Sequence, residues 1–418
     1  MSTPHVAVPL AVAAAFTALA MFAPLSHADG PFGDTALTPI ERLGKALFED
    51  ASLSEPAGQS CASCHDPALA FTGNAGSSIP AISRGAASGA AGTRNTPTIM
   101  YTAFSPLFSF VTETGEDGQT EHVPTGGLFH DGRAKSLADQ VHTPLLNPAE
   151  MNNASADTIA AKLRATYARD FIAVFGPGAL QTGDRAMDSL AAAIAAYESS
   201  ARFMPFQSKF DRHLRGEADL SRSEMRGFAL FKDPDKGNCI ACHAGNVHSR
   251  DPRDWLFTDF TYDNLGVPRN AAIPANADME VFDLGLCKQE GIEGIAPDGF
   301  DIGSLCGAFK VPTLRNVAVT APYFHNGVFT SLRDVVAFYA TRDTDPGRWY
   351  GNEYARFDDL PRAFTENVNT SEPPYDRKPG ETPRLNDAEI DDLVAFLRTL
   401  TDDTVMAAQA AGSDQVGQ

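Results

Sequence analysis

The sequence predicts a mainly α-helical protein whose body consists of two domains related by internal duplication. A CxxCH motif occurs twice, at 61–65 and 239–243, and each copy follows a segment with the same helical pattern. Short runs downstream of the first motif also recur, in the same order, downstream of the second. A chain of 418 residues has room for two or three domains of ordinary size.

The first 28 residues have the character of a secretory signal peptide. Residues 6–24 are almost wholly apolar, and Ser26-His27-Ala28 places small residues at the first and third positions before Asp29. This pattern fits cleavage after Ala28. The segment before the apolar run lacks Lys and Arg, so an uncleaved membrane anchor is the alternative. We expect export to a periplasm-like compartment and leave 1–28 out of the fold.

The acidic composition excludes two classes of partner. The chain has 33 Lys and Arg against 53 Asp and Glu, a formal net charge of −20. Such a field repels nucleic-acid phosphates and anionic lipids, whereas it attracts a basic protein. Beyond the signal segment no apolar stretch reaches about 18 residues, so we expect no membrane span in the processed chain.

Both CxxCH motifs have the attachment signature of c-type haem. They read Cys61-Ala-Ser-Cys64-His65 and Cys239-Ile-Ala-Cys242-His243. In such a motif two thiols add to the vinyl groups of one porphyrin, and the following imidazole becomes the proximal iron ligand. A shared zinc site and a disulfide within each CxxC are the alternatives. A four-cysteine zinc site usually brings its pairs within a few tens of residues, whereas these begin 178 positions apart. The sequence therefore predicts two cytochrome c-like haem domains.

The remaining cysteines, Cys287 and Cys306, have no neighbouring histidine and lie 19 positions apart in a Gly- and Asp-rich segment. In an oxidising compartment we expect them to form a structural disulfide. Closing a loop of that length contributes roughly 3 kcal/mol in the chain-entropy model.

The same capped helix is predicted before each haem motif. The two helices begin with S/T-x-x-E capping boxes at Thr38 and Ser221. Gly44 and Gly227 follow at equivalent positions. A glycine inside a helix is unfavourable unless another backbone must approach closely. Cytochrome c domains cross two helices at such a place, so we expect each glycine to mark a helix crossing.

Three further pairs of runs extend the duplication. They are Pro97-Thr98 with Pro312-Thr313, His130-Asp131-Gly132 with His325-Asn326-Gly327, and Ser136-Leu137-Ala138-Asp139 with Ser331-Leu332-Arg333-Asp334. Each half then closes with an amphipathic helix, predicted over 187–197 and 386–400. The domains are therefore expected at 29–205 and 206–402. The small and polar residues of 403–418 predict a disordered tail.

The duplication also predicts that the two irons differ. Aligning His130 with His325 places Tyr339 of the second half opposite Pro144 of the first. If this helix covers the distal face of its haem, one iron meets a phenol and the other a residue that cannot coordinate it. One iron is then six-coordinate, and the other has an open position for a small oxidant.

These residues resemble the di-haem cytochrome c peroxidase/MauG family over nearly the whole mature chain, from Leu37 to Leu400. Beside the two haem motifs, the most specific runs are Phe129-His130-Asp131-Gly132-Arg133-Ala134, Asn147-Pro148-Ala149-Glu150-Met151, Val311-Pro312-Thr313-Leu314-Arg315-Asn316 and Tyr323-Phe324-His325-Asn326-Gly327. The resemblance implies that 29–205 is the peroxidatic domain and that 206–402 is the electron-transfer domain.

Tyr339 is the residue that the resemblance marks as an axial ligand of the second haem. It stands fourteen positions after His325, where typical bacterial peroxidases carry Met and MauG carries Tyr. The sequence thus resembles the MauG-type branch. A phenolate favours high iron oxidation states, whereas a thioether favours the reduced state. The alternative is a core tyrosine on an amphipathic helix that contains Val335, Val336 and Phe338.

Three residues match the distal pocket of the first haem in the family. Glu150 matches the carboxylate that takes a proton from one peroxide oxygen and returns it to the other. Alternatively, Asn147-Pro148-Ala149-Glu150 spells an N-cap, a first-turn proline and a capping-box glutamate. Gln140 and Pro144 match distal residues of MauG, with Gln140 either a donor to bound peroxide or a surface glutamine.

The resemblance also implies a Ca²⁺ site between the haems. Asn95, Thr320 and Pro322 match it, and in the family one amide oxygen, backbone carbonyls and water supply the ligands. Oxygen-only ligation of this kind suits Ca²⁺. The alternative is an ordinary Asn-Thr-Pro turn.

Three departures limit what the resemblance implies. His130 stands where the family has a tryptophan between the haems, and imidazole is harder to oxidise than indole, which weakens hole transfer there. No histidine lies between His65 and His122, so the loop ligand of resting bacterial peroxidases is missing and no reductive activation is expected. Gly237 and Asn238 replace a surface tryptophan of MauG, so its quinone-forming role does not transfer.

We therefore expect a periplasmic di-haem c-type peroxidase that reduces hydrogen peroxide. Its electrons would come from a small redox protein, such as a cytochrome c or a cupredoxin. One alternative is a MauG-like enzyme that oxidatively modifies residues of a partner protein. Another is a non-catalytic di-haem electron carrier, against which an open first haem argues. A homodimer is compatible with the resemblance, because dimers are common in the family.

Overall fold

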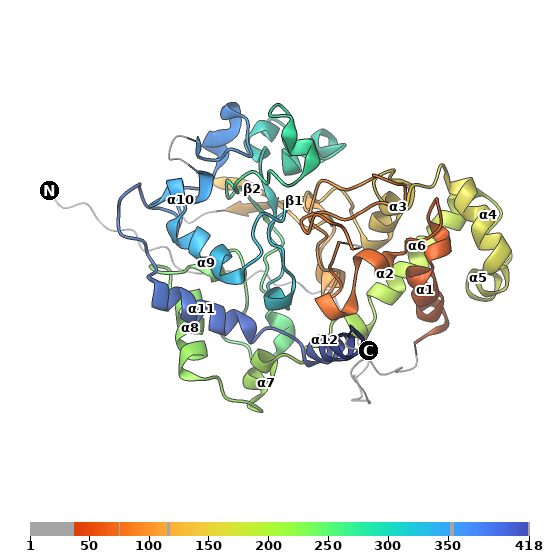
Figure 1. Ribbon diagram of the computed structural model, residues 1–418, viewed down its shortest axis with the longest axis horizontal. Helices are drawn as coiled ribbons and strands as arrows, with labels where there is room; N and C mark the ends of the chain where they lie inside the picture. The colour runs from red at the N-terminus through yellow and green to blue at the C-terminus, as the bar shows by residue number, and fades with distance from the viewer. Residues whose placement is uncertain (1–36, 75, 115–117, 352–354, 417–418) are drawn as a thin grey trace.

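Two helical lobes, joined along the middle of the molecule, make up the protein (Figure 1). The computed structural model describes residues 37–416 except 75, 115–117 and 352–354, so the predicted signal peptide lies outside the described residues. The first lobe contains α1 (Pro39–Glu49), α2 (Cys61–Cys64), α3 (Leu137–Leu146), α4 (Ala156–Thr166), α5 (Ala168–Phe175) and α6 (Gly183–Glu198). The second contains α7 (Lys209–Arg215), α8 (Arg222–Lys232), α9 (Leu332–Thr341), α10 (Pro346–Tyr350) and α11 (Asp387–Arg398). The mainly α fold of two lobes is confirmed.

Both predicted helix crossings are present. Helix α1 packs on α6, and α8 packs on α11. A Cβ atom on Gly44 would clash with the carbonyl oxygen of Ala193, and one on Gly227 would clash with that of Asp392. Each glycine therefore lets two helix backbones approach more closely than any other residue allows. The capping boxes at the starts of α1 and α8 are formed as predicted.

Each lobe has its own hydrophobic core behind these crossed helices. In the first lobe, α1, α4 and α6 bury mainly aliphatic side chains, including Leu47, Leu163 and Leu190. The core of the second lobe is largely aromatic, with Phe210, Phe231, Trp255, Phe257 and Phe396 in mutual edge and tilted contacts. The two predicted closing helices are observed as α6 and α11.

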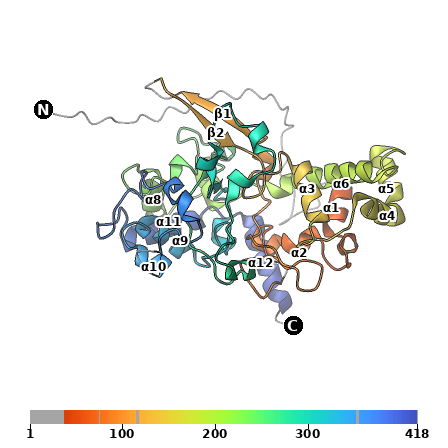
Figure 2. The ribbon, with the colours of Figure 1, turned by 90° about the horizontal axis from the view of Figure 1, so that it is seen from above.

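A hairpin from the first half of the chain crosses to the second lobe. It consists of β1 (Ser109–Thr114) and β2 (Thr120–Thr125), which pair antiparallel and stand out from the helices (Figure 2). Phe108, at its base, is buried with Leu286 and Ile292. A second short antiparallel pair joins β3 (Tyr262–Asp263) to β4 (Phe309–Lys310).

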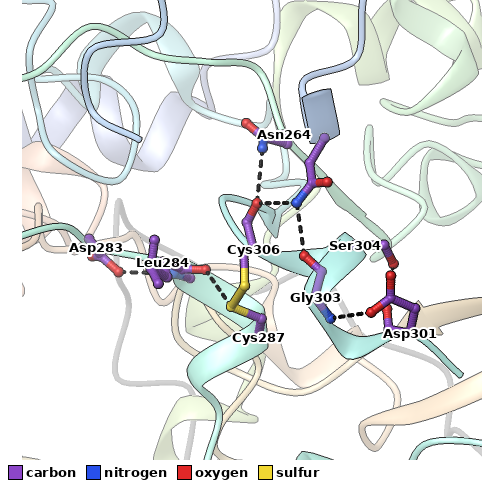
Figure 3. The surroundings of a disulfide bond; sticks show 10 residues. Asn264, Asp283, Leu284, Cys287, Asp301, Gly303, Ser304 and Cys306 are labelled. Carbon is purple, nitrogen blue, oxygen red and sulfur yellow. Dashed lines mark hydrogen bonds between the residues drawn. A yellow bond between two sulfur atoms is a disulfide. The ribbon is translucent and has the colours of Figure 1, made fainter. Parts of the chain in front are cut away.

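The loop under the hairpin contains the predicted disulfide between Cys287 and Cys306 (Figure 3). The Asn264 side chain donates a hydrogen bond to the carbonyl oxygen of Cys306 at 3.2 Å, and the Asn367 side chain donates to the same oxygen at 3.1 Å. The disulfide therefore holds together a segment that has little regular secondary structure of its own.

The predicted disordered tail is wrong for residues 403–416, which form helix α12 (Asp403–Val416). Figure 1 shows α12 beneath the junction of the lobes, and it packs against the 3-10 helix η2 (Pro67–Leu69). Val405 is buried in the core of the first lobe, and Asp403 pairs with Arg212. Alanine, which is common in this segment, has the highest helix propensity, and the buried Val405 docks the helix on the core.

None of the helices among the described residues combines the length and the apolar character needed to cross a lipid bilayer.

Candidate functional site

A continuous cavity of about 960 Å³ runs through the interior and connects the two CxxCH motifs. The four cysteines and two histidines of the motifs all line it: Cys61, Cys64, His65, Cys239, Cys242 and His243. The four motif thiols are free, so the alternative of a disulfide within each CxxC is wrong. Within the described ranges no three His, Cys, Asp or Glu side chains gather as a metal site.

The two motif histidines are oriented in the same way. His65 Nδ1 lies 2.8 Å from the carbonyl oxygen of Phe71, and His243 Nδ1 lies 3.2 Å from that of Phe257. A carbonyl can only accept, so each Nδ1 carries the proton and each Nε2 is left for a metal. Burial lowers the pKa of His65, and it lowers the pKa of His243 to about 4, so both rings are neutral, as ligation requires. The residues present therefore fit two haems.

The same backbone geometry positions both histidine acceptors. Phe71 has a φ of 56° and Phe257 a φ of 54°, a left-handed conformation that bulky residues rarely adopt. The acceptor carbonyls of both motif histidines are therefore presented by the same backbone conformation.

On the distal side of the first motif, the structure brings Gln140, Pro144 and Glu150 together on one wall of the cavity. Gln140 and Pro144 come from α3, and Glu150 from the turn that follows it. Burial raises the pKa of both thiols of the first motif, and the nearby Glu150 carboxylate adds to this effect. All three predicted distal residues therefore line the cavity, and Glu150 lies near the first motif.

Glu150 is held by its neighbour and does not cap a helix. Asn147 donates from Nδ2 to Glu150 Oε1 at 2.8 Å. Burial raises the pKa of the carboxyl, and the Asn147 hydrogen bond and the charge of Arg133 oppose this effect. The capping alternative is wrong, because Asn147 ends α3 and residues 148–151 form a turn.

Tyr339 occupies the equivalent place at the second motif. Helices α3 and α9 begin with equivalent N-caps, Ser136 and Ser331, and Tyr339 lies as far along α9 as Pro144 lies along α3. Tyr339 lines the cavity, whereas its neighbour Phe338 is buried in the core of the second lobe. Burial raises the pKa of the Tyr339 phenol, and the second motif's thiols add to this effect.

His130 lines the cavity in a neutral, hydrogen-bonded state. Its Nε2 donates to the carbonyl oxygen of Asn95 at 2.9 Å. The backbone N–H of Asn95 in turn donates to the carbonyl oxygen of His325 at 2.7 Å. Burial, together with the charge of Arg94, lowers the pKa of His130 to about 4. The two equivalent histidines are therefore connected through Asn95.

Asn95, Thr320 and Pro322, which match the family's Ca²⁺ site, all line the cavity. The Asn95 side chain donates from Nδ2 to the carbonyl oxygen of Pro322 at 2.6 Å. In the described part of the chain, Asn95 Oδ1 is buried and has no hydrogen-bond partner. An unsatisfied buried oxygen beside backbone carbonyls is compatible with a hard cation.

Two ionisable residues of the cavity wall could not be found from the sequence. Burial raises the pKa of Glu198 to about 8 and lowers the pKa of Lys310 to about 7. Glu198 directly follows the last residue of the helix predicted over 187–197, and Lys310 lies in a strand of two residues. Neither belongs to a motif, and only tertiary packing makes them buried.

Comparisons with known proteins agree with this site. The sequence model of a family described as "Di-haem cytochrome c peroxidase" matches residues 39–219. The methylamine utilization protein MauG of Paracoccus denitrificans is 39% identical over 87% of this chain and 88% of that protein. Cytochrome c551 peroxidase of Nitrosomonas europaea is 30% identical over 72% of this chain and 74% of that protein.

A solved structure shares the fold at similar coverage. The crystal structure of the diheme peroxidase BthA from Burkholderia thailandensis matches with a TM-score of 0.81 and 43% identity, over 91% of this chain and 90% of that one. Family membership implies two covalently bound haems c, for which the two motifs and their oriented histidines provide the ligands. The chain belongs to the di-haem cytochrome c peroxidase family and is an oxidoreductase of the haem peroxidase type.

Proposed function

We propose that this protein is an exported di-haem peroxidase that reduces hydrogen peroxide with electrons from an external redox protein. The observation that carries the proposal is the difference between two equivalent helices. At the same place on the cavity wall, α3 has Pro144 and α9 has Tyr339. A proline cannot coordinate iron, so the first site keeps a position for peroxide, whereas a phenol can occupy the second.

Each CxxCH motif would hold one haem through two thioether bonds and one imidazole. When bound, the haems supply the iron that takes up peroxide and the electrons that reduce it. The protein's part begins with His65 and His243, whose Nδ1 hydrogen bonds to backbone carbonyls fix the planes of the imidazole rings.

Glu150 would carry the proton between the two oxygens of the peroxide. Because Asn147 holds Oε1, the other carboxyl oxygen is left to accept and return the proton. The raised pKa of Glu150 favours the return of that proton, since general acid–base catalysis is most efficient when the pKa approaches the working pH. Gln140, on the same wall, would donate a side-chain N–H to the peroxide, and Pro144 would exclude a protein ligand.

Tyr339 would be a protein ligand of the haem held by the second motif, which would place this protein in the MauG-type branch. The raised pKa keeps its phenol protonated, and the charge of Arg342 opposes this effect only in part. Coordination to iron would supply the positive charge that stabilises the phenolate. The lobe at 206–402 would then transfer electrons, and the lobe at 29–205 would react with peroxide.

A Ca²⁺ ion between the sites is part of the proposal. It would satisfy Asn95 Oδ1 together with the carbonyl oxygens of Thr320 and Pro322 and water. Elemental analysis of the purified protein should show calcium near one ion per chain, and Asn95→Ala should lose it. Calcium retained by that variant would contradict the assignment.

The electron donor is expected to be basic, because the chain carries a net charge of −20. A small cytochrome c or a cupredoxin fits this requirement. A second function, oxidation of residues in a partner protein, is favoured by the similarity to MauG. Export rests on the signal-like segment 1–28, and cell fractionation tests it.

Steady-state turnover distinguishes the two functions. The holoprotein is mixed with hydrogen peroxide and a reduced basic cytochrome c, and oxidation of the cytochrome is followed optically. Rapid, salt-sensitive turnover supports the peroxidase. If peroxide reacts with the haems but neither cytochromes nor cupredoxins are oxidised, the protein-modifying function replaces it.

A further inference from the structure

Tyr101 lies at the junction of the two lobes, where the duplication has placed two different residues in equivalent positions. Tyr101 comes four residues after Pro97, and Asn316 comes four residues after Pro312. Their φ angles are 64° and 63°, and each precedes a 3-10 helix, η3 (Thr102–Phe104) or η11 (Val317–Val319). The two positions are therefore structurally equivalent.

Both side chains donate to the same carboxylate oxygen. Tyr101 Oη lies 2.8 Å from Asp402 Oδ2, and Asn316 Nδ2 lies 2.9 Å from that atom. The other carboxylate oxygen accepts from the Gln207 amide at 3.0 Å. Asp402 is fully buried, and burial raises the pKa of its carboxyl above the usual range.

A hydrogen bond to Asp402 from this position does not require a tyrosine. Asn316 bonds the same carboxylate, and asparagine adopts positive φ more readily than bulky aromatic residues do. At position 101 the chain instead has a phenol in the less favourable conformation. What the phenol adds is a group that can lose an electron, already hydrogen-bonded to a base.

Tyr101 is also connected to the histidines of both motifs. Its amide donates to the Phe203 carbonyl at 2.9 Å, and the Phe203 ring lies 4.5 Å from that of Phe71, whose carbonyl accepts from His65. On the other side, the Arg315 guanidinium carbon lies 4.8 Å from the Tyr101 ring centre and 5.9 Å from that of Phe257.

Phe257 completes the second connection, because its carbonyl accepts from His243. Tyr101 is thus connected to the histidine of each motif, and it lines the cavity that joins the two motifs.

We propose that Tyr101 is a redox-active residue that supplies one electron to the peroxide-oxidised holoprotein while its phenolic proton passes to Asp402. This proposal rests on the peroxidase function above. The O–H bond of Tyr101 breaks, and an O–H bond forms on Asp402 Oδ2. One electron reduces the oxidised haem pair, and a neutral tyrosyl radical remains.

The surrounding charges favour this coupled loss over loss of the electron alone. Arg315, paired with Asp211 at 2.9 Å, places a positive charge over the Tyr101 ring, which disfavours a ring cation. Transfer of the proton to Asp402 keeps the ring neutral. The Phe206 amide, 3.1 Å from Tyr101 Oη, continues to donate to the oxygen after the proton has left.

The test uses the holoprotein, frozen after one equivalent of hydrogen peroxide and examined by EPR and optical spectroscopy. The wild type should give a narrow free-radical signal that changes its hyperfine pattern when ring-deuterated tyrosine is incorporated. Tyr101→Phe and Tyr101→Asn should lose that signal, and Asp402→Asn should reduce it. The matched control is Tyr350→Phe, because the buried Tyr350 hydroxyl donates to a backbone carbonyl that cannot take its proton.

Two results would overturn the proposal while leaving the peroxidase function intact. One is a wild type whose haem spectrum responds to peroxide without any deuteration-sensitive radical. The other is an unchanged radical in both Tyr101 variants. If the haem spectrum does not respond to peroxide, the peroxidase function itself fails, and this inference fails with it. Because Tyr101→Asn copies the residue at the equivalent position, it provides a second variant if Tyr101→Phe does not fold.

Discussion

Replacing Glu150 with glutamine removes the proposed proton carrier at the first motif and leaves its shape unchanged. The Asn147 side chain can still donate to the glutamine oxygen, as it does now to Glu150 Oε1 at 2.8 Å. General acid–base assistance is typically worth about 10²–10⁴ in rate. At about 1.4 kcal/mol per factor of ten, the barrier to peroxide reaction should rise by about 3–5 kcal/mol.

Stopped-flow mixing of the oxidised holoprotein with peroxide measures this rate through the haem absorbance. A matched control is Glu55→Gln, which removes an exposed carboxylate of the same lobe, 3.3 Å from Lys162, and should react at the wild-type rate. The wild-type rate should fall as acid protonates Glu150, and because the pKa of Glu150 is raised this fall should begin at a higher pH than for an ordinary glutamate. The Glu150→Gln variant should lack this fall. A wild-type rate in Glu150→Gln would refute the reasoning, because neither catalysis nor helix capping would then explain the residue.

Three further predictions concern the second haem and the fold. Tyr339→Met should raise the reduction potential of one haem and alter its optical and EPR spectra, and an unchanged spectrum would remove Tyr339 as a ligand. Gly227→Ala should destabilise the protein by about 1–3 kcal/mol in chemical denaturation, because the new methyl group meets the carbonyl oxygen of Asp392. The control Gly294→Ala, where a Cβ has nothing within 4 Å, should be nearly neutral, and equal stability of the two variants would contradict the crossing argument. Burial raises the pKa of the Glu198 carboxyl from 4.5 to about 8, so the folded protein binds the carboxyl proton more tightly than the unfolded chain does. The stability that this provides is complete below pH 4.5 and is lost as the pH rises through 8. Glu198→Gln should therefore flatten the decline of stability between pH 4.5 and 8, and a parallel decline in the variant would exclude Glu198 as its cause.

Features that repeat in the chain could be predicted from the sequence. The two CxxCH motifs, the capping boxes and the paired glycines Gly44 and Gly227 each occur twice, so each copy supported the interpretation of the other. The alignment of Tyr339 with Pro144 also rests on the internal duplication. A local pattern, once duplicated, predicted both the crossing of helices and the difference between the two sites.

Single features that depend on tertiary contact could not be predicted. Helix α12 is not evident from its small and polar residues, because the burial of Val405 that docks it is a tertiary contact. The burial of Glu198 and Lys310 depends on what surrounds them in space. Whether Asn147 begins a helix or ends one depends on the fold, and the structure shows that α3 ends there.

The central claim is that the first haem is open and the second is closed by Tyr339. The most direct measurement is an EPR and optical spectrum of the fully oxidised holoprotein, before and after one equivalent of peroxide and without prior reduction. The account predicts a high-spin signal from the first haem that disappears on mixing. Two low-spin haems that respond to peroxide only after one of them is reduced would contradict it, because the first iron would then have a sixth ligand.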